Sequence, residues 1–324
     1  MHDTQSSATA MTEGSTPEGR QGAFDILKFV LSAFVVLIHA PWAEGTFADA
    51  LLRTTFAIMA VPLYFCMAGF FLFQKLPEGP LRLRKDRLRV WRYAGRTLLL
   101  YVLWVALYLP LVRAVAQHTW FLGALAAGAA ICGVLAMFLR REALFLLALA
   151  PFLFVPLAQP LVSVPLIGPF IDMAHRQYPA GLVTAMAALT LGALLAQYPP
   201  KKERPRRQII LMAAAGFALS FSQLLPFDIH VFSLVLLPSC FLILRAMQHA
   251  RVPNSPRLTF LRRCGFLIYL LHPVVLQLLR LMDAPLWKIP FVLFLCSFGA
   301  SFALAAGWLL LERQKAFRFL KILH

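Results

Sequence analysis

The chain has 324 residues, of which 60% are hydrophobic and only 14% are charged, and its mean hydropathy is +0.73. Soluble domains are about 45–50% apolar and about 25% charged, so this composition excludes an ordinary water-soluble domain. The formal net charge is +17. In a soluble protein this charge would suggest nucleic acid, but a membrane protein acquires it from Lys and Arg in its cytoplasmic loops. We therefore expect an integral membrane protein that binds no nucleic acid.

Apolar runs recur along the whole chain. A helix needs about 20 apolar residues to cross the hydrocarbon of a bilayer, and no charged residue occurs between Phe291 and Leu311. The sequence predicts an all-α, polytopic transmembrane helical bundle of about ten spans. We place the expected spans at residues 24–42, 51–73, 97–116, 119–138, 142–160, 180–197, 208–225, 228–247, 264–282 and 288–311.

Basic residues cluster in alternate loops, and the stretch from Lys75 to Arg96 alone carries eight of them. Loops rich in Lys and Arg face the cytoplasm, so we expect both termini there and an even number of spans. The polar residues 1–22 are expected to form a disordered cytoplasmic tail. Residues 23–313 would form the transmembrane domain, and residues 314–324 a basic cytoplasmic tail. The spacing of the five cysteines matches no zinc or disulfide pattern, so no metal is expected.

The first expected span carries three ionisable residues, Asp25, Lys28 and His39. A charge within the hydrocarbon is costly, so such residues indicate a functional site. Asp25 and Lys28 are three positions apart, which allows them to pair. Lys28 and His39 are eleven positions apart, or about 20° beyond three helical turns, and therefore share a helix face at a separation of roughly 16 Å. Two structural interpretations stay open: Lys28 could extend to the inner interface, and His39 could be an interfacial residue at the end of the helix.

Three segments carry a family resemblance. The segment Phe24–His39 contains a basic residue, ten intervening residues and a histidine. The segment Ala60–Leu72 contains Val-Pro-Leu-Tyr-Phe and Ala-Gly-Phe, and the segment Phe266–Pro273 ends in Tyr-Leu-Leu-His-Pro. Together, in this order and at this spacing, they resemble the acyltransferase 3 family of membrane acyltransferases. The first two helices, with lysine where the family usually has arginine, resemble the membrane domains of VanT-type serine racemases.

The resemblance implies acyl transfer across a bacterial inner membrane by a multi-pass enzyme. An acyl-CoA, most simply acetyl-CoA, would be the donor substrate rather than a bound cofactor, and the acceptor would be a hydroxyl of an extracytoplasmic glycan or lipid-linked molecule. His39 would act as the base, and Lys28 and Asp25, nearer the other end of the first helix, would be the other two catalytic residues. Five residues would hold the donor: Arg89, Arg92, Arg96, Tyr269 and His272.

Two positions depart from the family pattern. Lys28 offers a point charge where arginine would offer a fork for bidentate binding, and Ala68 stands where the family has serine. An alternative function is a transporter or flippase-like membrane module that uses the same polar face, for example for amino-acid uptake. An enzyme would require an acyl donor, whereas a transporter would move its substrate without one.

Overall fold

The structure is a computed structural model. It describes residues 19–40, 43, 45–109, 117–177, 181–200, 204–224, 229–250, 252–282 and 284–323. Helices, turns and bends make up this part of the chain, and no strand occurs among the described residues. The predicted all-α fold is confirmed.

The bundle is built from long helices that follow one another along the chain. They are α1 (Gly19–His39), α3 (Ala60–Phe73), α4 (Arg84–Tyr108), α6 (Trp120–Leu135), α7 (Arg141–Leu157), α9 (Gly181–Gln197), α10 (Pro205–Leu224), α11 (Ile229–His249), α12 (Pro256–Leu281) and α13 (Pro290–Leu311). Short elements connect them: α2 (Phe47–Ala50), η1 (Leu51–Phe56), η2 (Ala57–Met59), η3 (Gln117–Thr119), η4 (Gln159–Ser163), α8 (Gly168–Gln177), η5 (Pro285–Lys288) and η6 (Lys315–Leu323). Each expected span overlaps one of the long helices, in the expected order.

Four helical segments are long and apolar enough to cross a membrane by length and composition: Gly22–His39, Phe47–Phe73, Pro256–Leu281 and Pro290–Leu311. Three shorter apolar helices accompany them: Trp120–Leu135, Gly181–Gln197 and Leu234–His249. Large apolar side chains on the outer faces of the bundle, such as Leu146 and Leu304, are exposed, as expected for a surface in contact with lipid. The chain is therefore a helical membrane protein, and the number of ten crossings stays a prediction.

Helix α4 differs from the third span that the sequence predicts at residues 97–116. The helix begins at Arg84, after Leu83 in an extended conformation, and therefore includes most of the basic stretch that was expected to be a loop. Arginine, lysine and leucine favour helix, and Asp86 in the first turn complements the helix dipole. The basic residues of this stretch consequently lie on a helix that continues into the apolar segment.

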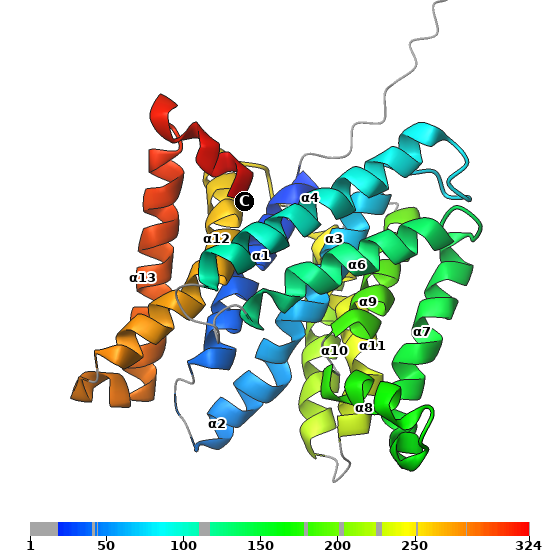
Figure 1. Ribbon diagram of the computed structural model, residues 1–324, viewed down its shortest axis with the longest axis horizontal. Helices are drawn as coiled ribbons and strands as arrows, with labels where there is room; N and C mark the ends of the chain where they lie inside the picture. The colour runs from blue at the N-terminus through cyan, green and yellow to red at the C-terminus, as the bar shows by residue number, and fades with distance from the viewer. Residues whose placement is uncertain are drawn as a thin grey trace, which may run out of the picture.

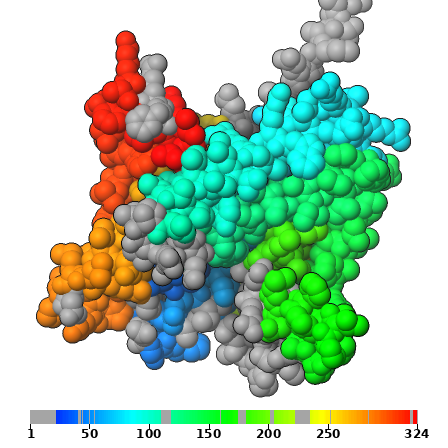
Figure 2. All heavy atoms as spheres, viewed as in Figure 1, coloured from blue at the N-terminus to red at the C-terminus, as the bar shows by residue number. Residues whose placement is uncertain are grey.

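Figure 1 shows the arrangement of the helices. The start of α1 and the end of α13 lie at the same end of the bundle, the upper end in this view, which we call the basic end because α4, α10 and α12 begin there with basic residues. Helices α4 and α6 run obliquely across the front, and their side chains cover the middle of this face in the space-filling view (Figure 2). The C-terminal η6 is attached to α4, because the Trp104 indole donates to the Leu323 carbonyl at 2.9 Å.

Helices α3 and α9 cross in direct backbone contact. A Cβ on Gly69 of α3 would overlap the backbone of Leu189, and a Cβ on Gly192 of α9 would overlap the backbone of Cys66 and Phe70. Small residues at a crossing allow two helix backbones to approach closely, which is a common way of packing helices in membranes. The two glycines therefore set the distance between α3 and α9.

A buried arginine, Arg141, links α3 and α9 at the basic end of the bundle. The Arg141 guanidinium, at the start of α7, donates to the carbonyls of Phe73, Leu76 and Pro77 at 2.7–2.9 Å and to that of Ala193 at 3.2 Å. The last carbonyls of a helix lack partners within the helix. Arg141 supplies partners at the end of α3 and so links α3, α7 and α9.

We predict that Gly192→Ala lowers the stability of the protein by about 1–3 kcal/mol, because the added methyl group forces two backbones apart. Gly216→Ala on α10 is the matched control. A Cβ there meets no atom within 4 Å, and replacing a helical glycine by alanine stabilises by about 0.5–1 kcal/mol. Thermal unfolding of the purified variants in detergent measures both effects. Equal transition temperatures for the two variants would contradict the close crossing.

Candidate active site

One face of helix α1 lines two cavities, one near each end of the helix. Lys28 lines a cavity of about 520 Å³ near the basic end, and His39 lines a cavity of about 240 Å³ near the opposite end. Phe121 of α6 lines both cavities, so its ring stands between them. The face that Lys28 and His39 share therefore looks into the bundle, on the side where α3, α6 and α12 supply the other walls.

The Lys28 cavity combines basic and aromatic side chains. The Lys28 ammonium lies 4.4 Å from the centroid of the Phe71 ring, a cation–π contact that partly compensates for its removal from water. The Tyr64 hydroxyl donates to the Lys28 carbonyl at 2.5 Å and thereby fixes α3 against α1. Ala68, the position that departs from the family pattern, also lines this cavity.

Asp25 pairs with α12. Its carboxylate is buried and lies 3.4 Å from the guanidinium of Arg262, while the Lys28 ammonium is directed to Phe71. A neighbouring ion pair joins α12 to the end of α13: the guanidinium of Arg263 lies 2.6 Å from the carboxylate of Glu312. Arg262 and Arg263 both line the Lys28 cavity, and sequence analysis assigned neither of them to the site. The opening of this cavity is consequently rich in positive charge.

The three arginines expected to hold the donor lie on α4. Arg89, Arg92 and Arg96 are exposed, and none of them is among the described residues that line the Lys28 cavity. Tyr93 does line it. At about 100° per residue, Arg89 and Arg96 lie about 40° and 60° from Tyr93 on the same side of α4, and Arg92 lies about 100° away on that side.

The Arg89 guanidinium also donates to the carbonyl of Lys75, a lysine that lines the Lys28 cavity, at 2.6 Å. The face of α4 that carries Arg89 is thus joined to the rim of the cavity. A hydrogen bond therefore connects Arg89 to the rim of the cavity.

Three histidines meet at the opposite end of α1. The His39 ring lies 5.4 Å from the His272 ring, nearly parallel to it, and 4.6 Å from the His118 ring at 68°. All three line the smaller cavity. Among the described residues, no group of three or more His, Cys, Asp or Glu side chains is placed to hold a metal ion. We call this set, His39, His118 and His272, the histidine cluster.

His118 was not identified from the sequence. It lies in η3, immediately before the apolar helix α6, so the criterion that selected His39, an ionisable residue at the edge of a span, applies to it equally. The Tyr269 hydroxyl donates to the His118 carbonyl at 2.8 Å and holds η3 against α12. At the end of α1, Arg280 donates to the His39 carbonyl at 3.1 Å. Both hydrogen bonds connect the cluster to α12.

The proline after His272 explains how this ring is oriented. Pro273 has no N–H, so the Tyr269 carbonyl loses its partner in the helix. The His272 Nδ1 lies 2.8 Å from this carbonyl and 3.1 Å from that of Ile268, and it must carry a proton to bond with either. In the neutral ring, Nε2 is then the unprotonated nitrogen. It is buried and has no hydrogen-bond partner among the described residues, which leaves it available as an acceptor.

Comparison with known proteins defines the class of this site. The acyltransferase 3 family model, described as an acyltransferase domain, matches residues 21–310, which is most of the chain. The protein therefore belongs to the acyltransferase 3 family and is a membrane acyltransferase. No curated protein and no solved structure matches the chain.

We predict that His272→Asn and His272→Leu differ in stability. The asparagine amide reaches the same carbonyls as Nδ1, whereas leucine leaves the buried Tyr269 carbonyl without a partner, at a cost of about 1–3 kcal/mol. Thermal unfolding should therefore place the asparagine variant near the unsubstituted protein and the leucine variant below it. If both variants unfold together, Nδ1 contributes nothing to this carbonyl.

Proposed function

We propose that this protein transfers an acetyl group, or a related acyl group, from a cytoplasmic acyl-CoA to a hydroxyl of an extracytoplasmic glycan or lipid-linked acceptor, with His39 as the base. The observation that carries the proposal is the pair of cavities on one face of α1. One contains Lys28 and opens among basic residues, and the other contains the histidine cluster. Donor and acceptor would each enter from their own side of the membrane.

The basic end suits the donor. Coenzyme A carries phosphates, and arginine binds phosphate through parallel hydrogen bonds. Arg89 and Arg96 would collect these phosphates on the face of α4 next to Tyr93, with Arg92 beside them. Arg262 and Lys28 line the interior, so the negative charge of the donor would be opposed along its path. The acyl thioester would then reach past Phe121 towards His39, in the direction that Tyr269 and His272 line from α12.

The histidine cluster is suited to deprotonating the acceptor hydroxyl. A neutral imidazole can accept a proton near pH 7, and the base must lie within hydrogen-bond reach of the hydroxyl that it deprotonates. His39 would take the proton of the acceptor hydroxyl while its oxygen attacks the thioester carbonyl. The C–S bond then breaks, an ester forms, and the coenzyme A thiolate leaves and takes up a proton.

The other members of the cluster would position the base. His272 presents the unprotonated Nε2 in the same cavity, and its ring stacks on His39, which restricts the orientation of the His39 imidazole. The His39 carbonyl is held by Arg280, so the backbone of the base is also fixed. Positioning of this kind keeps a catalytic group in its productive geometry.

The membrane orientation belongs to the same proposal. With the basic end in the cytoplasm, as the positive-inside rule requires, Lys28 faces the compartment that contains acyl-CoA and His39 faces the outside. We place the protein in a bacterial inner membrane on this basis. Asp25, paired with Arg262, would hold α1 and α12 together beside the donor path rather than contact the reacting atoms.

We predict that His39→Ala reduces acyl transfer at least about a hundredfold, the usual effect of removing a general base. Membranes that contain the variant are incubated with radiolabelled acetyl-CoA, and label in the glycan and lipid fractions is counted. Val30→Ala is the matched control, since it shortens an exposed side chain of the same helix and should leave transfer unchanged. Retained transfer in His39→Ala, at equal protein in the membrane, would refute the assignment. Substrate movement that needs no acyl donor would favour a transporter instead.

A further inference from the structure

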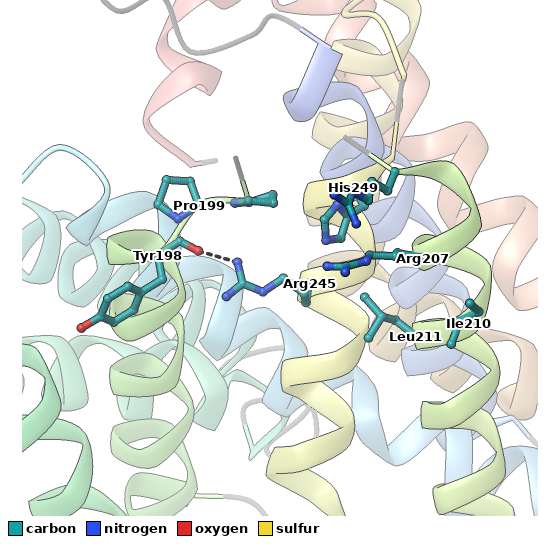
Figure 3. A pocket seen from close by; sticks show the side chains of 9 residues that line it. Tyr198, Pro199, Arg207, Ile210, Leu211, Arg245 and His249 are labelled. Carbon is teal, nitrogen blue, oxygen red and sulfur yellow. Dashed lines mark hydrogen bonds between the residues drawn. The ribbon is translucent and has the colours of Figure 1, made fainter. Parts of the chain in front are cut away.

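A third cavity lies at the basic end, apart from helix α1. It has a volume of about 840 Å³ and lies between the end of α9, the start of α10 and the end of α11 (Figure 3). It shares no lining residue with the cavities of Lys28 and His39. The proposed acyl transfer does not involve this cavity, so the residues that line it require a separate explanation.

Positive charge dominates this cavity. Three arginines line it, Arg204, Arg207 and Arg245, beside the imidazole of His249, and no carboxylate is among the described residues that line it. The side chain of Arg207 extends from α10 into the space beside His249 and opposite Arg245 (Figure 3). Like charges gathered in one cavity repel each other unless an anion lies between them. The cavity is therefore complementary to a negatively charged group.

The guanidinium of Arg245 is held in place by the protein. It donates to the Tyr198 carbonyl, as the dashed line in Figure 3 marks, and to Oε1 of Gln248 at 2.9 Å. Gln248 is itself buried and donates to the Leu195 carbonyl at 3.3 Å. A fixed guanidinium loses little further freedom when it binds an anion. Arg245 is thus a preorganised part of the cavity.

The two arginines at the start of α10, Arg204 just before the helix and Arg207 in its first turn, are the adaptable part. Arg204 and Arg207 are exposed, and within the described part of the chain no hydrogen bond or ion pair involves either guanidinium. They are three residues apart in the chain, and both line the cavity. Their donors are available for an oxygen-rich anion such as a phosphate.

An apolar face continues from the arginines along α10. Ile210 lines the cavity one turn beyond Arg207. Phe217 lies seven residues after Ile210, and Phe221 lies four residues after Phe217, so the three side chains share nearly the same helix face. The two phenyl rings stack with their centroids 5.8 Å apart. All three side chains are exposed. The face extends roughly 16 Å along the helix from Ile210, a length over which an alkyl chain could lie.

This combination of an anion cavity and an adjoining apolar face matches an amphiphile better than a soluble anion. Basic pockets between helices at the cytoplasmic side of a membrane recognise the headgroups of anionic lipids. We propose that the cavity binds the phosphate of an anionic phospholipid between Arg207, Arg204 and Arg245, with an acyl chain of the lipid along the exposed face of α10. The lipid is a partner of the protein and takes no part in acyl transfer.

Native mass spectrometry of the delipidated, full-length protein tests this proposal. Phosphatidylglycerol is added in one arm and zwitterionic phosphatidylcholine in the other, and the bound lipid is counted. We expect the unsubstituted protein to retain phosphatidylglycerol in preference to phosphatidylcholine. Arg207→Gln should weaken this retention about tenfold, the effect of losing one charged hydrogen-bonding partner. Arg207→Lys, which keeps the charge, should restore part of it.

Arg206→Gln is the matched control. Arg206 is the next residue on the same helix and is exposed, but it does not line the cavity. Its variant removes the same charge and should bind lipid as the unsubstituted protein does. An equal loss in both variants would reduce the effect to general surface charge and overturn the proposal. Displacement of the lipid by inorganic phosphate or by coenzyme A at similar concentrations would overturn it as well, because the site would then recognise a soluble anion.

Discussion

The close crossing of α3 and α9 is the constraint on which the rest of the bundle depends. At Gly69 and Gly192 the backbones themselves are in contact, so neither helix can move towards the other or accept a side chain between them. With one face fixed on α9, helix α3 turns Tyr64, Ala68 and Phe71 towards α1 and the Lys28 cavity. Arg141 completes the arrangement at the basic end by binding the carbonyls that follow α3. The two glycines thus position one wall of the candidate site.

The site itself is divided along α1. The Lys28 end has the charges that phosphates require, and the opposite end has imidazoles in a small cavity. The ring of Phe121 lies between the two cavities. Its centroid is 4.7 Å from that of the Phe65 ring and 5.3 Å from that of the Tyr269 ring. A division of this kind would keep the charged part of a donor away from the reacting group, and an aromatic ring between the two cavities would restrict the passage of water. An acyl transferase that works across a bilayer needs both properties.

Part of this architecture could be predicted from the sequence, because it depends on local patterns. Run lengths of apolar residues gave the helices in order, and helical periodicity placed Lys28 and His39 on one face. The contacts that complete the site join residues far apart in the chain, and no local pattern encodes them. Asp25 meets Arg262, and His118 lies against His39 from η3, which the Tyr269 hydroxyl links to α12. The boundary predicted at residue 97 is wrong, because α4 already begins at Arg84: the apolar run that marks a span starts later than the helix, and arginine and lysine favour helix.

The central claim is that donor and acceptor meet from opposite sides of the membrane. The direct measurement uses sealed vesicles in which the basic end of every counted protein faces outward, as established by cleavage of a tag at the N-terminus. Radiolabelled acetyl-CoA is supplied either outside the vesicles or inside them, and labelled acceptor is counted in the lumen. The account predicts lumenal acylated product only when the donor is outside, on the side of Lys28 and the α4 arginines. Equal product from donor supplied inside the vesicles would contradict it.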